Sequence, residues 1–314
     1  MNLISKIGSL FLFPFSIIYD VITSLRNFLY DKKILSSIKF NLPIISVGNL
    51  SVGGTGKTPM VEYIASYYLS KNYNIALLSR GYKRKTSGFI IANKNENYIT
   101  IGDEPMQFYF KFQNKLIVTV CEDRKEGINK IIQNYPKINL IILDDAFQQR
   151  KIVSSFNIVI SNFNKPFFND YLMPFGRLRE KRNNISRGEM VIFSKTPSNT
   201  HDEVLNEYKL KSRKYILNDD KIFFSKILYS NPVPFSSNGL STEVINNVIT
   251  VSSISDSKLF LDYIRSKYIL QKSYNFPDHH IFTINDVTKI LSNLNRDTSL
   301  IITEKDATKF RNYR

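Results

Sequence analysis

The 314 residues suffice for one large domain or two ordinary ones, and 43% hydrophobic with 22% charged residues excludes a disordered or wholly membrane-embedded chain. A single cysteine, Cys121, excludes an internal disulfide, and no set of histidines and cysteines has zinc-site spacing. The net charge of +16 fits an anionic partner (nucleic acid, acidic lipid or a phosphorylated substrate) or a general compositional bias towards lysine.

The first predicted element is an amphipathic N-terminal helix. Thirteen uncharged, mostly apolar residues separate Lys6 from Asp20, fewer than the roughly 20 that a membrane span needs, and no signal-peptide cleavage site follows. After Pro14, apolar residues recur at helical spacing, with polar residues on the other face and cations on the flanks. The apolar set is Ile17, Ile18, Val21, Ile22, Leu25, Phe28 and Leu29, the polar set Asp20, Ser24, Asn27 and Asp31, and the cations Lys6, Arg26, Lys32 and Lys33. Such a helix either caps the core or lies in a membrane interface, and the flanking cations favour the interface.

From residue 42 onward, buried-strand segments alternate with helical patterns. Strands are predicted at 43–49, 74–81, 115–120, 139–145, 156–161 and 189–195, and helices at 57–69, 104–112 and 123–134. This α/β alternation predicts a mostly parallel sheet with helices on both faces. After about 218 we expect an extended ribbon at 221–235 and then a smaller α/β domain. The predicted domains are an N-terminal helix at 1–35, a core at 36–218 and a C-terminal domain at 219–314.

The stretch "VGNLSVGGTGKTPMVEY" at 47–63 has the strand, glycine-rich turn and helix of a phosphate-binding loop. Its glycines let backbone N–H groups approach phosphate oxygens, Lys57 would neutralise the β- and γ-phosphates, and Thr58 would offer its hydroxyl to Mg²⁺. The predicted ATP-binding residues are Ser51, Val52, Gly53, Gly54, Thr55, Gly56, Lys57 and Thr58. Partition-type ATPases carry a lysine where this chain has Val52, which makes that class the second choice.

Four further motifs carry candidate site residues. "NLIILDDAFQQR" ends an apolar strand in Asp144 and Asp145, as expected beside the magnesium of a phosphate-binding loop. Taken singly, each of the other three motifs also has an interpretation without a functional site. Asp103 and Glu104 in "IGDEPMQF" could simply begin a helix, and the histidines of "FPDHH" could lie in a solvated loop. The basic residues of "LMPFGRLREKRN" could form a solvated face at a helix start.

In order along the chain, seven motifs together resemble the tetraacyldisaccharide 4′-kinases, the lipid A 4′-kinases of Gram-negative bacteria. They are "SVGNLSVGGTGKTP", "LLSRGY", "GDEP", "DDAFQQR", "LMPFGRLRE", "FPDHH" and "TEKDA". Ser51 fits, because the loop of this family typically opens with Ser or Thr before Val-Gly-Gly. The chain departs from the family at Ala146 and Gln149, where Gly and His are usual, which puts in doubt any role for those two positions.

The resemblance implies transfer of the ATP γ-phosphate, with Mg²⁺, to the 4′-hydroxyl of an acylated disaccharide 1-phosphate lipid, giving lipid IVA. By the family pattern, Asp103 pairs with His279 to take the hydroxyl proton. Thr58, Glu104, Asp144 and Asp145 are the expected metal site, and Arg124, Arg177 and Arg179 the expected lipid-substrate site. The predicted domain boundary separates Asp103 from His279, which suggests domain closure on the substrate.

The resemblance also implies a peripheral monomer on the anionic cytoplasmic face of the inner membrane. The alternatives are a partition-type ATPase and an ATPase stimulated by nucleic acid, and for the latter no nucleic-acid-binding module is recognisable.

Overall fold

The computed structural model describes residues 11–216, 218–235, 245–295 and 297–313. The chain forms two compact units: unit 1 comprises Met1–Arg80 and Lys115–Ile227, and unit 2 comprises Gly81–Asn114 and Leu228–Arg314. This division differs from the predicted one in three ways. The boundary before the C-terminal residues lies at 227/228 instead of 218/219. The N-terminal helix belongs to unit 1, and residues 81–114, which we assigned to the core, belong with the C-terminal residues.

Unit 1 is built on a parallel sheet. Its strands are β2 (Ile44–Asn49), β3 (Ile75–Ser79), β5 (Ile117–Val120), β6 (Leu140–Asp144), β8 (Phe156–Asn162), β9 (Met190–Ser194) and β10 (Ile222–Phe224), in the spatial order β10-β9-β8-β2-β6-β3-β5. β2, β3 and β6 are buried along their whole length, as expected for central parallel strands covered on both faces. The prediction of an α/β fold with a mostly parallel sheet is confirmed. A separate parallel pair, β1 (Ile38–Lys39) with β7 (Ile152–Val153), was not predicted.

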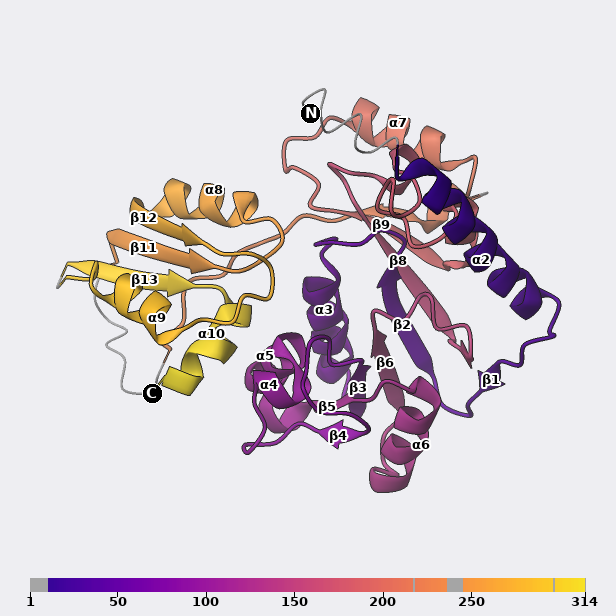
Figure 1. The fold of residues 1–314 in the computed structure, drawn as a ribbon, viewed down its shortest axis with the longest axis horizontal. Helices are drawn as coiled ribbons and strands as arrows, with labels where there is room; N and C mark the ends of the chain where they lie inside the picture. The colour runs from indigo at the N-terminus through magenta and orange to yellow at the C-terminus, as the bar shows by residue number, and fades with distance from the viewer. Residues whose placement is uncertain (1–10, 217, 236–244, 296, 314) are drawn as a thin grey trace. The chain divides into compact units, whose positions relative to one another are not determined.

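The helices of unit 1 are α2 (Phe13–Asp31), α3 (Lys57–Ser70), α6 (Arg124–Asn134) and α7 (Asp202–Ser212), with the 3₁₀ turns η2 (Phe167–Asn169), η3 (Arg182–Arg187) and η4 (Asp219–Lys221). Figure 1 shows α3 and α6 on opposite sides of strands β2 and β6. The Asp123 side chain accepts hydrogen bonds from the first turn of α6, which explains why that helix begins there. We did not predict α7, whose Tyr208 ring stacks on Phe163 in an aromatic cluster beside β9.

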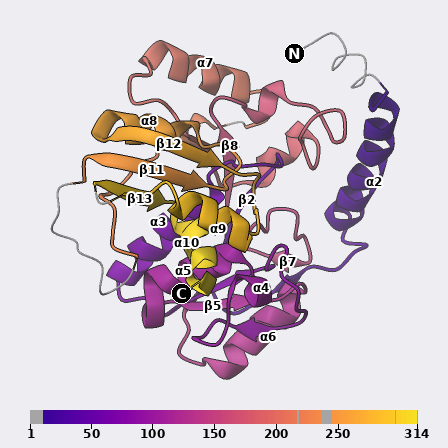
Figure 2. The same ribbon diagram turned by 60° about the vertical axis from the view of Figure 1, so that its left-hand side comes forward.

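Helix α2 turns its polar residues inward and its apolar residues outward. Ser16 and Asn27 are its buried residues, whereas Ile18, Val21 and Ile22 are 57–61% exposed. In Figure 2 the helix lies at the periphery of unit 1. Of the predicted flanking cations, Lys6 lies outside the described residues. In the described part of the chain, no helix combines the length and the apolar content that crossing a membrane requires.

Unit 2 contains a three-stranded parallel sheet in the order β12-β11-β13. The elements of unit 2 are β4 (Ile90–Ile91), α4 (Tyr98–Ile101), α5 (Asp103–Phe112), β11 (Asn247–Ser252), α8 (Lys258–Lys267), β12 (Ile269–Asn275), α9 (Ile284–Leu291), β13 (Thr298–Ile302), α10 (Glu304–Phe310) and η5 (Arg311–Tyr313). The 3₁₀ turn η1 (Gln113–Lys115) crosses from unit 2 into unit 1. Successive side chains of a strand point to opposite faces of the sheet, so the core of unit 2 consists of two clusters. In one, Val248 packs with α8, and in the other, Val251 packs with α9 and α10. The predicted ribbon at 221–235 contributes only the short strand β10.

Candidate active site

The glycine-rich loop leaves β2 and enters α3. Gly53 and Gly56 have φ of 96° and 86°, in the left-handed region that glycine adopts without a steric penalty. Gly56 is the N-cap residue of α3 and has no side chain to cap the helix. The Asn49 amide donates to the Thr55 hydroxyl at 2.8 Å, and Ser194 Oγ donates to the Thr55 carbonyl at 2.5 Å, so the strand ends fix the loop. A helix N-terminus approached through glycines is suited to a phosphate group.

Lys57, the first residue of α3, faces an acidic residue that follows β6. Its Nζ lies 3.7 Å from Oδ1 of Asp145, and Nη1 of Arg179 donates to the same oxygen at 2.8 Å. Burial opposes ionisation of Asp145, but the charges of Lys57, Arg179 and Arg124 outweigh it and hold the pKa of this carboxyl below its usual value. Asp144, the last residue of β6, is buried and pairs in register with Val47 of β2. The two aspartates therefore lie where the glycine-rich loop begins.

Residues 171–179 form a loop beside the glycine-rich loop, where we expected the start of a helix. Ser51 and Leu178 form an antiparallel bridge, Val52 N donates to the Arg177 carbonyl at 2.8 Å, and Arg179 N donates to the Leu50 carbonyl at 2.6 Å. The first helical turn after this loop, η3, begins only at Arg182. The backbone of these residues thus braces the glycine-rich loop.

The three arginines expected at the lipid substrate differ in their surroundings. Arg177 pairs with Asp170 at 2.9 Å and its side chain is 37% exposed, whereas Arg179 pairs with Asp145. Arg124 is buried and donates to the carbonyls of Cys121 (2.5 Å) and Asp144 (3.1 Å). Its guanidinium therefore fastens the end of β6 to α6.

In unit 2, Asp103 and His279 form a close pair. Nδ1 of His279 lies 3.0 and 2.9 Å from the two carboxylate oxygens of Asp103, and the side chains are 14% and 7% exposed respectively. Asp103 opens α5 directly after Gly102, whose φ is 96°, and His279 itself has φ of 61°. The Tyr82 ring meets the imidazole edge-on at 5.2 Å. Because both residues belong to unit 2, their pairing requires no closure of one unit on the other, and the boundary we predicted between them is wrong.

Asp103 is strongly stabilised as a carboxylate. Burial alone would raise its pKa, but the hydrogen bond from His279 and the charges of Lys305, His279 and Lys309 lower the pKa to about 2. A carboxyl with so low a pKa is a weak base that stays ionised at neutral pH and can accept a hydrogen bond from the imidazole.

Two lysines at this pair were missed by the sequence analysis. Lys309 is 2% exposed and lies 3.3 Å from Oδ2 of Asp103, and it also donates to Ser253 Oγ at 2.9 Å. Lys305 pairs with Asp278 at 2.9 Å and lies 3.4 Å from Nε2 of His279. Both belong to α10: Lys305 lies in the "TEKDA" motif, in which no site residue was predicted, and Lys309 lies two residues beyond that motif. Their spacing of four residues was the available signal, since it places both on one face of a helix.

The sequence analysis also did not predict a set of buried hydrogen bonds that links α2 to the loop after β6. Glu180, which is fully buried, accepts hydrogen bonds from Asn27 (2.9 Å), Gln148 (3.1 Å) and Arg187 (2.7 Å). Gln148 also donates to the Asn49 carbonyl at 2.9 Å, at the end of β2. Nothing in the local sequence marks Glu180 as buried, because Asn27 and Gln148, two of its partners, are distant in the chain.

The four expected metal ligands are divided between the units. Thr58, Asp144 and Asp145 belong to unit 1, and Glu104 belongs to unit 2, where it lies 3.7 Å from Lys305. Within the described ranges, no three or more His, Cys, Asp and Glu side chains are arranged to hold a metal ion.

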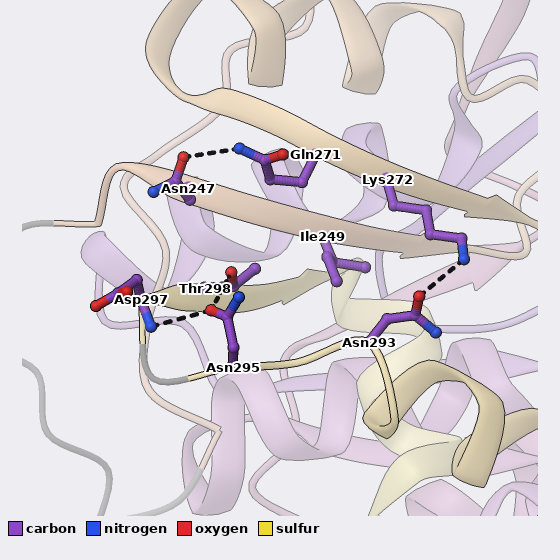
Figure 3. A pocket seen from close by; sticks show the side chains of 8 residues that line it. All are labelled: Asn247, Ile249, Gln271, Lys272, Asn293, Asn295, Asp297 and Thr298. Atoms are coloured by element: carbon purple, nitrogen blue, oxygen red, sulfur yellow. Dashed lines mark hydrogen bonds between the residues drawn. The ribbon is translucent and has the colours of Figure 1, made fainter.

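A polar pocket in unit 2 lies away from these residues. It is lined by side chains at the beginning of β11, on β12 and around the start of β13. Figure 3 shows hydrogen bonds among the polar ones, as in the pair Lys272–Asn293. None of the predicted site residues lines it. The pocket is therefore separate from the candidate chemistry.

Comparisons with known proteins agree on one family. The family model described as tetraacyldisaccharide-1-P 4′-kinase matches residues 8–314. Curated proteins named tetraacyldisaccharide 4′-kinase are similar: that of Flavobacterium johnsoniae is 41% identical over 308 residues, covering 98% of this chain and 87% of the relative. That of Porphyromonas gingivalis is 39% identical over 304 residues, covering 94% and 84%.

A solved structure extends this agreement to the fold. The crystal structure of LpxK from Aquifex aeolicus in complex with ATP superposes with a TM-score of 0.74 at 29% identity, covering 96% of this chain and 90% of that one. Fold, motif order and sequence identity agree over almost the whole length, and the chain belongs to the tetraacyldisaccharide 4′-kinase family.

Proposed function

We propose that this protein is an ATP-dependent kinase that phosphorylates the 4′-hydroxyl of tetraacyldisaccharide 1-phosphate, forming lipid IVA for lipid A synthesis. The observation that carries the proposal is the buried Asp103–His279 pair. A kinase must remove a proton from an alcohol, and an imidazole oriented by a carboxylate is suited to that task. Membership of the family supplies the identity of donor and acceptor.

The nucleotide would bind at the glycine-rich loop. Backbone N–H groups of residues 51–58 and the N-terminus of α3 would contact its phosphates, and Lys57 would offset the charge on the transferring group. The pairing of Lys57 with Asp145 holds the ammonium at the mouth of the loop, and Arg179 holds Asp145 in turn.

A magnesium ion fits beside the glycine-rich loop of unit 1. Hydroxyl and carboxylate oxygens are the ligands that Mg²⁺ prefers, and the register of Val47 with Asp144 brings the end of β6 beside the loop that carries Thr58. We assign Mg²⁺ to Thr58 and Asp144, because Asp144 ends β6 in register with Val47, where the glycine-rich loop begins. When bound, the ion would neutralise charge on the phosphate oxygens. The Glu104 carboxylate faces Lys305, and we leave it out of the metal site.

The low pKa of Asp103 indicates which residue of the Asp103–His279 pair accepts the hydroxyl proton. Asp103, with a pKa of about 2, stays ionised, accepts a hydrogen bond from Nδ1–H of His279 and orients the ring. The Nε2 lone pair of His279 would then accept the proton of the 4′-hydroxyl as the oxygen attacks phosphorus. For the lipid 1-phosphate we retain Arg177, whose guanidinium is partly exposed.

The lipid substrate requires access to a membrane surface, and α2 is suited to provide it. Its apolar side chains point outward, and Lys32 and Lys33 at its end are exposed. We therefore propose a monomer bound peripherally to the cytoplasmic face of the inner membrane.

The direct test is an assay with labelled ATP and tetraacyldisaccharide 1-phosphate in detergent micelles, followed by chromatography of the lipid. We expect one new phosphorylated lipid that requires enzyme and ATP and is absent with His279→Ala. Hydrolysis of ATP without labelled lipid would contradict the proposal.

A further inference from the structure

We propose that Lys305 is a positioning residue that occupies Nε2 of His279 in the resting enzyme and leaves it when the phosphate groups of the substrates arrive. The inference rests on the proposed kinase function and goes beyond it, because it assigns the "TEKDA" lysine a part in controlling the proton acceptor.

The geometry determines which ring nitrogen carries the proton. An ammonium group only donates, so a hydrogen bond from Lys305 Nζ at 3.4 Å requires a lone pair on Nε2 of His279. The ring proton of the neutral imidazole then lies on Nδ1, which faces the Asp103 carboxylate at 2.9 Å. The two neighbours therefore select the same tautomer from opposite sides of the ring.

Lys305 is held as a cation near this ring. Burial favours its neutral form, but Asp103, Glu104 and Asp278 outweigh burial and raise the pKa of Lys305. Its Nζ lies 2.9 Å from Asp278, 3.7 Å from Glu104 and 3.9 Å from Asp103. The imidazole of His279 is faced by Asp103 from α5, Lys305 from α10, the neighbouring Asp278 and the Tyr82 ring. Two further charged groups face its partners: Glu104 lies near Lys305, and Lys309 lies near Asp103.

The two lysines of α10 differ in freedom. Lys309 is enclosed by Ser253, Asp306 and Asp103 with 2% of its side chain exposed, so it remains a fixed counterion of Asp103. Lys305 is 11% exposed, and its principal partner, the Asp278 carboxylate, is 35% exposed. Lys305 is thus the cation that an incoming anionic phosphate could attract away from Nε2, which frees the lone pair for the hydroxyl proton.

The test compares Lys305→Met, Lys305→Arg and the control Lys111→Met. The control removes another lysine that bridges α5 and α10, through its 2.9 Å pair with Glu304, without touching His279. Two readouts are needed: ¹⁵N NMR titration of the ring nitrogens, which only three histidines make tractable, and kcat/KM against pH in the micelle assay, because kcat/KM reports the free enzyme in which Lys305 occupies Nε2. In Lys305→Met, removal of a cation next to Nε2 should favour protonation of that nitrogen and should move the acid limb of kcat/KM to higher pH.

We expect Lys305→Met to lose activity at neutral pH and to recover much of it at alkaline pH, with Lys305→Arg and Lys111→Met close to wild type. A uniform loss at every pH, or an increased KM with an unmoved His279 titration, would overturn the proposal in favour of a structural or substrate-anchoring role. If the wild type itself phosphorylates no lipid, the proposed function fails, while the NMR titration still tests the contact between Lys305 and His279.

Discussion

The guanidinium of Arg179 donates to the carboxylate of Asp145 at 2.8 Å, and the same carboxylate oxygen lies 3.7 Å from Lys57. Arg179 thereby contacts the same carboxylate as Lys57, the lysine of the glycine-rich loop. Arg179→Ala should remove a charge-assisted hydrogen bond of about 1.5–3 kcal/mol and lower kcat/KM for ATP by roughly 10- to 150-fold.

Arg177→Ala is the matched control, because Arg177 pairs with Asp170 rather than with Asp145. We expect this variant to retain the ATP KM and to raise the KM for the lipid. Steady-state kinetics with each substrate varied in turn distinguishes the two arginines. Equal effects of both changes on the lipid KM alone would return Arg179 to the lipid site.

Lys57→Ala should nearly abolish phosphoryl transfer in a folded protein. The lost electrostatic contact with the transferring group is worth about 3–4 kcal/mol, or on the order of 10²–10³ in kcat. Lys71→Ala, at the C-cap of the same helix, serves as control and should leave kcat unchanged. Circular dichroism establishes folding, and wild-type turnover by folded Lys57→Ala would refute the phosphate-loop assignment.

Asp103→Asn and His279→Ala should each lower kcat strongly, and the double variant should be little worse than the worse single variant. The two side chains form one hydrogen-bonded unit, so removal of either disables the other. A double-mutant cycle on kcat measures the coupling. Losses that multiply in full would show that the two residues act independently.

The sequence predicted the central strands and the glycine-rich loop well because those signals are local. The apolar run of β6 and the glycines before Lys57 act through their own neighbours in the chain. The environments of Lys305 and Glu180 could not be predicted in this way, since each is buried by residues more than 20 positions away. The same limitation explains the misplaced boundary between Asp103 and His279: residues 81–114 join unit 2 through tertiary packing, which leaves no periodic pattern.

Asp103 should also contribute a pH-dependent stability to unit 2. Its folded-state pKa of about 2 lies below the ordinary 3.8, so the contribution is complete above about pH 4 and is lost as the pH falls towards 2. A shift of this size corresponds to on the order of 2 kcal/mol. Denaturant unfolding of wild type and Asp103→Asn, compared between pH 5 and pH 2, should show a stability difference that shrinks with acidity. A difference independent of pH would contradict this account.

The outward apolar face of α2 should bind anionic membranes. Replacing Ile18 and Ile22, which are 57% and 61% exposed, by Gln should weaken vesicle binding by about tenfold or more, because each loses apolar area worth roughly 25 cal/mol per Å² in the interface. The fold should tolerate the changes, since the helix is attached through its polar side: Ser16 donates to the Leu172 carbonyl, Tyr19 to the Arg179 carbonyl and Asn27 to Glu180.

Co-sedimentation with vesicles containing anionic lipid, at low and high salt, measures this binding. The matched control is Leu210→Gln, which removes an equally exposed apolar side chain (61%) from α7 in the same unit. We expect the control to sediment like wild type and the double α2 variant to remain in the supernatant, with binding of all forms weakened by salt as Lys32 and Lys33 are screened. If the α2 variant binds as tightly as the control, the outward apolar face has another role. If instead it loses thermal stability, the face packs in solution against protein, and the interfacial assignment of α2 is wrong.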